Sequence, residues 1–201
     1  MIRFLENDNR IESYNEQINK KQKIIKICML GTSGVGKTNL LNNLTKGEHV
    51  KLSSDEEIFY RVQYTVNKYS SNSKVVHIWD ISGKKEYETF LHLGVNDSKI
   101  VLGVFNICQP ESLLILRNNL LSIIYKKLKN CQLILIGTHS DLNMNLDHRI
   151  TIAQGWNMAR SLGALGYFQI SNKKLEDIDN LSNFLFDFIT LNKFKKECKI
   201  M

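Results

Sequence analysis

The stretch that decides the fold reads KIIKICML followed by GTSGVGKT, and it runs from Lys23 to Thr38. Its first half is rich in β-branched residues and stops at Gly31, which is typical of a strand that feeds a turn. Residues 37–46, which follow the glycine-rich half, have a helical pattern. The stretch therefore predicts a strand, a glycine-rich loop and a helix in direct succession.

The glycine-rich loop matches the pattern G-x-x-x-x-G-K-[ST] at every fixed position. Such a loop turns successive backbone N–H groups toward phosphate oxygens, and the helix after it adds its positive end. We expect Lys37 to reach the β- and γ-phosphates of a nucleotide and the Thr38 hydroxyl to bind Mg²⁺. A chance glycine-rich turn is the alternative, and the strand and helix around the loop argue against it. The predicted phosphate-binding residues are Ser33, Gly34, Val35, Gly36, Lys37 and Thr38.

Strands and helices alternate along the rest of the chain. Further strands are predicted at 60–68, 74–80, 100–107, 132–137 and just before residue 170, and helices at 84–93, 111–128, 151–163 and 175–194. This alternation predicts an α/β fold, with a mostly parallel six-stranded sheet and helices on both faces. Residues 60–80 predict a hairpin that places one antiparallel strand at the edge. We expect a domain at 23–192, an N-terminal extension at 1–22 and a tail at 193–201.

Two acids follow strands of this sheet, at the end where ligands bind in such folds. Asp80 is placed to hold Mg²⁺ through water, and the backbone N–H of Gly83 to reach the γ-phosphate. The D-x-x-G pattern alone is more often a turn, and its spacing from the phosphate loop makes it a candidate site. Asp141 is placed to accept hydrogen bonds from guanine N1–H and the exocyclic amine, a pair that adenine does not offer.

A loop formed by Ser171, Asn172 and Lys173 follows a short strand and is predicted to cover the base. The chain resembles the Ras superfamily of small GTPases in the order of its motifs. These are the phosphate loop, the D-x-x-G segment, the base-reading acid and the Ser-x-Lys loop. The resemblance covers roughly residues 23–194 and implies GTP or GDP with Mg²⁺ as ligands. It also implies switch regions near 47–58 and 82–95, which respond to the γ-phosphate.

The resemblance is weakly Rho-like, in Thr138 and in the segment 163–168. The segment between Asp141 and Thr151 leaves no room for the insert helix common in Rho proteins, and Ser33 is more typical of Rab proteins. The resemblance further implies effectors, an exchange factor and a GTPase-activating protein as partners, and we expect a monomer.

The base-reading motif departs from the family pattern Asn-Lys-x-Asp, because Thr138 and His139 stand in its first two places. We keep both as guanine-binding residues, with the imidazole stacking where a lysine stem normally covers the base. The family's Ser-Ala-Lys becomes Ser-Asn-Lys, with Asn172 in the middle. The switch I threonine that binds Mg²⁺ has no clear match. Ser54 is the candidate metal ligand, although Ser53 and Ser54 could equally be plain loop residues.

The position after Gly83 carries the family's catalytic glutamine, which orients the attacking water. This chain has Lys84 there. An ammonium has three donors and no acceptor, so it cannot accept a hydrogen bond from the water. With Gly83 and Lys84 in the catalytic positions, we expect slow GTP hydrolysis.

The chain ends in Cys198-Lys199-Ile200-Met201, which fits the C-a-a-X prenylation pattern apart from the lysine. Upstream lysines would supply the second, electrostatic signal that a single lipid needs; an incidental cysteine is the alternative. The net charge of +7 comes without an aromatic-interleaved basic stripe, so we expect no nucleic-acid partner. Without a signal-peptide or membrane-spanning pattern, we expect a cytoplasmic protein, peripheral on the cytosolic face of a membrane.

Two functions of different class remain open on these residues. The first is a GTP/GDP switch that cycles slowly, and the second is a non-cycling scaffold that stays GTP-bound or holds nucleotide poorly. Lys84 and the missing switch I threonine motivate the second. A P-loop nucleotide kinase is disfavoured, because no second substrate site or arginine-bearing lid is evident.

Overall fold

The computed structural model describes residues 24–46, 50–51, 59–66, 74–127, 131–142 and 149–190. They form one seven-stranded sheet in the order β2-β3-β4-β1-β5-β6-β7. The strands are β1 (Ile25–Leu30), β2 (Val50–Lys51), β3 (Phe59–Val66), β4 (Lys74–Ile81), β5 (Ile100–Asn106), β6 (Gln132–Thr138) and β7 (Gly166–Gln169). The helices are α2 (Lys37–Leu44), η1 (Lys85–Phe90), α3 (Leu91–Val95), α4 (Pro110–Lys127), α5 (Ile152–Ser161) and α6 (Leu175–Thr190).

The sheet confirms the predicted α/β fold and corrects the strand count. Strands β4, β1, β5, β6 and β7 are parallel, and β3 pairs antiparallel with β4. The prediction of six strands misses β2, which has two residues and pairs antiparallel with β3. The antiparallel strand β3 therefore lies one place in from the edge.

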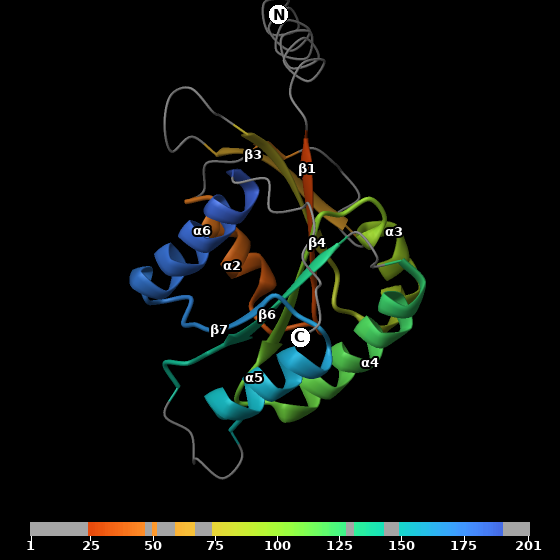
Figure 1. Ribbon diagram of the computed structural model, residues 1–201, viewed down its shortest axis with the longest axis vertical. Helices are drawn as coiled ribbons and strands as arrows, with labels where there is room; N and C mark the ends of the chain where they lie inside the picture. Colours follow the sequence, from red (N-terminus) through yellow and green to blue (C-terminus); the bar gives the residue numbers. More distant parts are fainter. Residues whose placement is uncertain are drawn as a thin grey trace, which may run out of the picture.

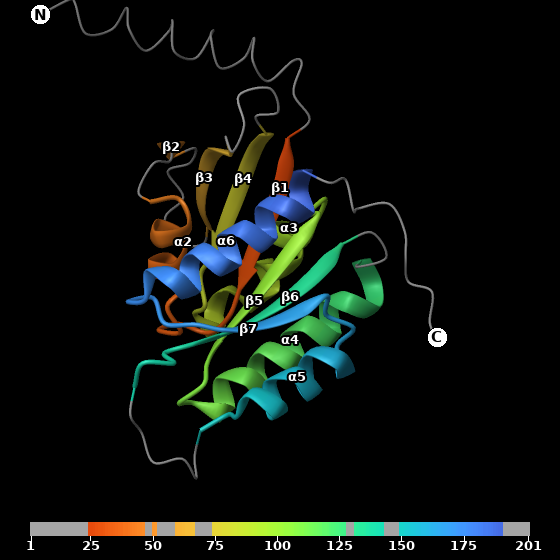
Figure 2. The same ribbon diagram turned by 60° about the vertical axis from the view of Figure 1, so that its left-hand side comes forward.

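Helices cover both faces of the sheet, as Figures 1 and 2 show. Alternation along β1 explains why two cores form: Ile27 and Met29 enter the core under α2 and α6, and Cys28 and Leu30 enter the core under α3, α4 and α5. Side chains of a strand alternate between its faces, so each β1 residue is assigned to one layer. Asn106 is paired with Thr138 where β5 and β6 end, on the rim where the sequence predicts the ligand-binding loops.

The region predicted as a helix at 84–93 differs in detail. Residues Lys85–Phe90 form a 3₁₀-helix, and only Leu91–Val95 continue as an α-helix. Lys84 at the N-terminal cap provides no side-chain hydrogen bond to the first turn. By contrast, Thr151 and Gln154 close a reciprocal capping box at the start of α5. The 85–95 segment thus has a weaker N-terminal cap than α5.

The described ranges contain three cysteines, and each of them is free. Cys28 is buried, whereas Cys108 and Cys131 are half-buried. Among the helices that the structure describes, none combines the length and the apolar character needed to cross a bilayer.

Candidate nucleotide-binding site

The phosphate loop lies between β1 and α2, where the sequence predicts it. Gly34 and Gly36 have φ values of 79° and 91°, a left-handed backbone that favours glycine. The Lys37 ammonium donates to the carbonyl oxygens of Gly31 and Thr32, at 2.9 and 3.0 Å. These bonds use two of its three N–H groups and hold the ammonium over the loop. Burial lowers the pKa of Lys37, and the charge of Asp80 opposes that shift.

A hollow of about 380 Å³ opens beside this loop. Its lining joins the two motifs that the sequence assigns to phosphate and metal. It consists of Ser33, Gly34, Gly36, Lys37, Thr38, Asn39, Asp80, Ile81, Ser82 and Gly83. Asn39 is an addition to the predicted set, since no motif position singles it out. The structure therefore brings the phosphate loop and D-x-x-G segment together around one cavity.

Thr38 and Asp80 meet in this hollow. The Thr38 hydroxyl donates to Asp80 Oδ2 at 2.8 Å. The other oxygen, Asp80 Oδ1, is buried and has no hydrogen-bond partner among the described residues. Burial raises the pKa of Asp80, while Lys37 and the Thr38 hydrogen bond lower it. A hydroxyl and a carboxylate with an unpaired oxygen are the hard oxygen donors that Mg²⁺ prefers, so these residues fit the metal.

Gly83 packs directly against the phosphate loop. Its carbonyl oxygen accepts a hydrogen bond from the Ser33 backbone N–H at 3.1 Å. A Cβ atom at Gly83 would collide with the backbone of Thr32 and Ser33. The glycine is therefore required by close backbone approach, a reason that the D-x-x-G pattern alone does not give.

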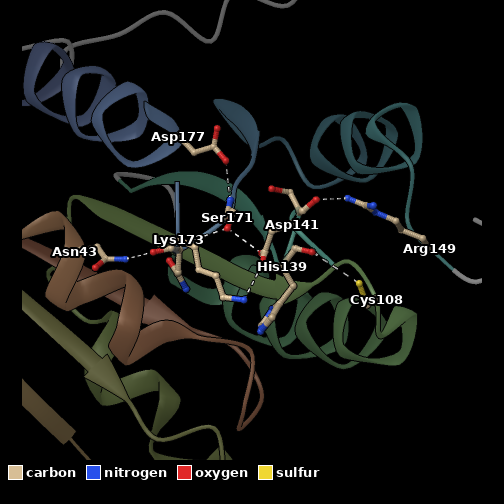
Figure 3. A network of polar contacts seen from close by, with 10 residues as sticks. Asn43, Cys108, His139, Asp141, Arg149, Ser171, Lys173 and Asp177 are labelled. Carbon is tan, nitrogen blue, oxygen red and sulfur yellow. Dashed lines mark hydrogen bonds and ion pairs between the residues drawn. The ribbon is translucent and has the colours of Figure 1, made fainter. Parts of the chain in front are cut away.

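The base-reading residues come together as the sequence predicts (Figure 3). Lys173 Nζ lies 3.0 Å from Asp141 Oδ2, and Ser171 Oγ donates to Asp141 Oδ1 at 2.8 Å. The hydrogen bonds from Lys173 and Ser171 lower the pKa of Asp141 to about 2. The carboxylate is thus ionised at neutral pH, as an acceptor for two guanine N–H groups must be.

Thr138 and His139 connect this region to the phosphate loop. The buried Thr138 hydroxyl lies 2.7 Å from the Val35 carbonyl oxygen and 3.0 Å from that of Phe105. His139 has a positive φ of 65°, and its Nδ1 lies 2.9 Å from the Thr138 hydroxyl. The threonine therefore ties the end of β6 to the phosphate loop, and the imidazole lies beside that tie.

Two supporting residues were not predicted from the sequence. Asp177 accepts a hydrogen bond from the Ser171 backbone N–H at 2.8 Å. Arg149 donates to the carbonyl oxygens of Ser140 and Leu142, at 3.0 and 3.3 Å, and so braces the turn that carries Asp141 (Figure 3). The sequence signal that could have found Asp177 is its place as an acid in the first turn of α6. Arg149 belongs to no motif.

Lys84 lies at the border of the site. Its ammonium is 3.7 Å from Glu86 Oε1, with both side chains more than half exposed, and 5.7 Å from the centre of the Tyr87 ring. It contributes to the lining of a smaller neighbouring pocket, while the lining of the phosphate hollow ends at Gly83. The structure therefore directs the ammonium toward Glu86 in the form described.

Some predicted residues fall outside the described ranges. These are the candidate metal ligand Ser54 with its neighbour Ser53, the lipidation candidate Cys198, the extension at 1–22 and the tail at 193–201. Of the proposed switch region at 47–58, the structure describes only the backbone of strand β2.

A mostly parallel sheet with a glycine-rich loop after its first strand defines the class of P-loop proteins. A sequence profile of the Ras family matches residues 26–190. The chain is 26% identical over 177 residues to the Ras-like GTP-binding protein RHO1 of Entamoeba histolytica, covering 88% of this chain and 81% of the relative. It is 27% identical over 165 residues to human RhoD, covering 77% of each, and 29% identical over 188 residues to human RhoE, covering 87% and 75%.

The chain therefore belongs to the Ras family of small GTPases, and these relatives are Rho proteins. This confirms both the superfamily resemblance and its Rho-like character.

Proposed function

We propose that this protein is a GTP/GDP-binding molecular switch with slow GTP hydrolysis. The observation that carries the proposal is Asp141, held ionised by Lys173 and Ser171 beside the phosphate loop. The guanine base would bind this carboxylate and lie between Thr138, His139 and the loop Ser171–Lys173. The phosphates of the same nucleotide would bind residues 33–38. Mass spectrometry of the nucleotide released from freshly purified protein tests the proposal, and recovery of adenine nucleotides alone would contradict it.

Magnesium is the proposed cofactor, held by Thr38 and, through water, by Asp80. The fit rests on the Thr38–Asp80 hydrogen bond and on the unpaired Asp80 Oδ1. The ion would neutralise charge on the β- and γ-phosphate oxygens. Ser54 is the proposed additional ligand from the first switch region.

The switch itself is proposed to involve residues 47–58 and 82–95. Gly83 bridges the second of these regions to the phosphate loop through the Ser33 N–H, so a ligand at the loop can influence residues that follow Gly83. Effectors, an exchange factor and a GTPase-activating protein are the partners expected of such a switch. Binding of the GTP-loaded form to a partner that ignores the GDP-loaded form would support it.

Hydrolysis is proposed to be slow because Lys84 cannot position water as a glutamine does. A glutamine carbonyl accepts a hydrogen bond from the attacking water, and an ammonium has no acceptor. The ammonium is also strongly hydrated and flexible, so holding a water in place would cost it entropy. In the structure its ammonium lies 3.7 Å from Glu86 Oε1, and Lys84 does not line the phosphate hollow.

Replacing Lys84 with glutamine should therefore raise the single-turnover rate of GTP hydrolysis. We expect the unmodified protein to turn over below the family's intrinsic range, on the order of 10⁻⁴ per second, and the variant to approach that range. Phosphate release after mixing GTP-loaded protein with Mg²⁺ measures both rates. The matched control is Lys85→Gln, which removes the neighbouring exposed charge. Equal rates for the unmodified protein and the Lys84→Gln variant would show that the lysine does not limit hydrolysis.

The second function, a non-cycling scaffold, is favoured by the same lysine. The two functions differ in single-turnover experiments, because a slow switch releases phosphate at a measurable rate and a scaffold shows no phosphate release beyond that of GTP in buffer. A variant Lys84→Gln that still retains GTP would favour the scaffold over the slow switch.

Membrane association is proposed to come from the tail at 193–201, attached to a GTPase domain at 23–192 that acts as a monomer. Prenylated Cys198 and the lysines before it would hold the protein on the cytosolic face of an anionic membrane. The residues 1–22 would form an N-terminal extension to this domain.

The variant Cys198→Ser should move the protein from the membrane pellet to the supernatant in a cell able to prenylate it. One lipid chain gives marginal binding, and basic residues without the lipid give less, so most of the protein should be released. Fractionation with immunoblotting measures the shift, and Cys131→Ser is the control that leaves the terminal cysteine in place. An unmodified C-terminal peptide in the mass spectrum of the original protein would remove prenylation from the proposal.

A further inference from the structure

The two loops assigned to the base each bind the phosphate loop, and they do so at consecutive carbonyl groups. Thr138 approaches the Val35 carbonyl oxygen at 2.7 Å. Asn172 Nδ2 donates to the next one, the Gly36 carbonyl oxygen, at 3.2 Å. The first contact joins the end of β6 to the loop, and the second joins the segment between β7 and α6 to the same loop.

Asn172 also makes a second contact, through its backbone carbonyl oxygen. Asn43, on α2, donates from Nδ2 to the Asn172 backbone carbonyl oxygen at 2.7 Å (Figure 3). The two contacts therefore connect Ser171–Lys173 to both ends of the segment between Gly36 and the last turn of α2. They bridge residues that are 136 and 129 positions apart in the chain.

The side-chain amide of the half-buried Asn172 has a specific role. Asn172 Oδ1 is buried and has no hydrogen-bond partner among the residues described. A side chain that only filled space would not retain an unpaired buried acceptor, because such a group is costly. The approach is also close, since a Cβ atom on Gly36 would lie 2.9 Å from Asn172 Nδ2. The amide donor is thus the polar group of this side chain that makes a contact.

We propose that Asn172, aided by Asn43, is a positioning residue that locks the base-reading loop to the phosphate loop and so slows nucleotide release. The inference rests on the proposed function, because it concerns the same nucleotide. With the ties in place, the loop at 171–173 cannot move away from the base without also pulling on Gly36, whose N–H belongs to the phosphate cradle. Release then requires both halves of the site to open together. Without the ties of Asn172 and Asn43, the loop at 171–173 loses its direct contacts with Gly36 and α2, so it can move away from the base more easily.

The test uses the full chain loaded with a fluorescent N-methylanthraniloyl derivative of GDP, chased with excess GDP in the presence of Mg²⁺. We expect Asn172→Ala to release the probe about three- to tenfold faster, the effect of one lost hydrogen bond. Asn172→Asp keeps the shape of the side chain and places an oxygen against the Gly36 carbonyl oxygen. This variant should therefore release the probe at least as fast as Asn172→Ala. Asn42→Ala, an exposed neighbour of Asn43 on α2, is the matched control and should release the probe at the original rate.

Two further measurements separate positioning from a general folding defect. The preference for GDP over ADP should be unchanged in Asn43→Ala, because Asp141 carries it, Asn43 lies on α2 outside the predicted guanine-binding set, and a damaged fold would lower it. Asn43→Ala should also speed release, and the double variant should fall short of the product of the two single effects, since both ties serve one joint.

The outcomes distinguish this inference from the proposed function. If the unmodified protein fails to bind the GDP probe, the proposed function is wrong. If the probe binds with a guanine preference that depends on Asp141, and Asn172→Ala and Asn43→Ala release it at the original rate, the inference alone is overturned. Loss of guanine preference in Asn43→Ala would also overturn it, because the variant would then disturb the whole site rather than one contact between the loops.

Discussion

Replacing Asp141 with alanine is expected to erase most of the preference for guanine over adenine nucleotides. A site built around paired hydrogen bonds to a ligand rejects an analogue that lacks them by a factor on the order of 10⁴. In this protein both oxygens of Asp141 are oriented by neighbours, Oδ1 by Ser171 and Oδ2 by Lys173. The alanine variant leaves the phosphate contacts intact, so it should bind GDP and ADP with affinities within roughly tenfold of each other.

Competition of GDP and ADP against a fluorescent GDP probe measures this preference. Asp179→Asn, which removes an exposed acid from α6, is the matched control. Because the pKa of Asp141 is about 2, the preference of the unmodified protein should not change between pH 5 and pH 8. Equal binding of ATP and GTP by the unmodified protein would refute the assignment of Asp141.

Replacing Thr38 with asparagine should weaken binding of Mg²⁺–GTP more than binding of GDP. The Thr38 hydroxyl lies at hydrogen-bond distance from Asp80, and the larger amide would disturb both the proposed metal ligand and its carboxylate neighbour. GTP depends more on the ion because the γ-phosphate adds charge that the ion neutralises. We expect the ratio of GTP to GDP affinity to fall about 10- to 100-fold, the range seen when groups around a metal are replaced.

Titration with each nucleotide at fixed Mg²⁺ concentration gives this ratio, and repeating it with excess chelator shows the share that the metal carries. Thr190→Asn is a matched control, since that hydroxyl bonds to its own helix at the Phe186 carbonyl, away from the site. An unchanged affinity ratio in Thr38→Asn would show that Thr38 is not a metal ligand.

Local patterns predicted those parts of the molecule that local physics determines. The run from residue 23 to 38 predicts β1, the loop and α2, because strand and helix each have their own periodicity and the glycines mark the turn between them. Asp80 and Asp141 were predicted to share a rim because parallel strands end on one side of a sheet. Strand β2 is not predicted, because a strand of two residues has no periodicity that a sequence can show. It is a strand because it pairs with β3.

Contacts between distant segments account for the rest. Asn43 belongs to no motif, and the sequence predicts only that Asn172 covers the base. Their shared contact appears only when α2 and the segment after β7 are brought together. Arg149 likewise acts through backbone carbonyls, which no pattern of residue types records. Lys84 shows the converse case, where the substitution is evident in sequence and its pairing with Glu86 emerges in three dimensions.

The Ser33 N–H donates a hydrogen bond to the Gly83 carbonyl oxygen. A phosphate oxygen bound in the loop would compete with Gly83 for this N–H. Binding of phosphate at Ser33 would therefore weaken the contact that holds the segment after Asp80 to the loop. A single such bond is worth about 1 kcal/mol, roughly a fivefold bias between two arrangements. A bias of this size favours the Ser33–Gly83 hydrogen bond when the loop is empty. A charged ligand that makes several contacts with the loop would outweigh it.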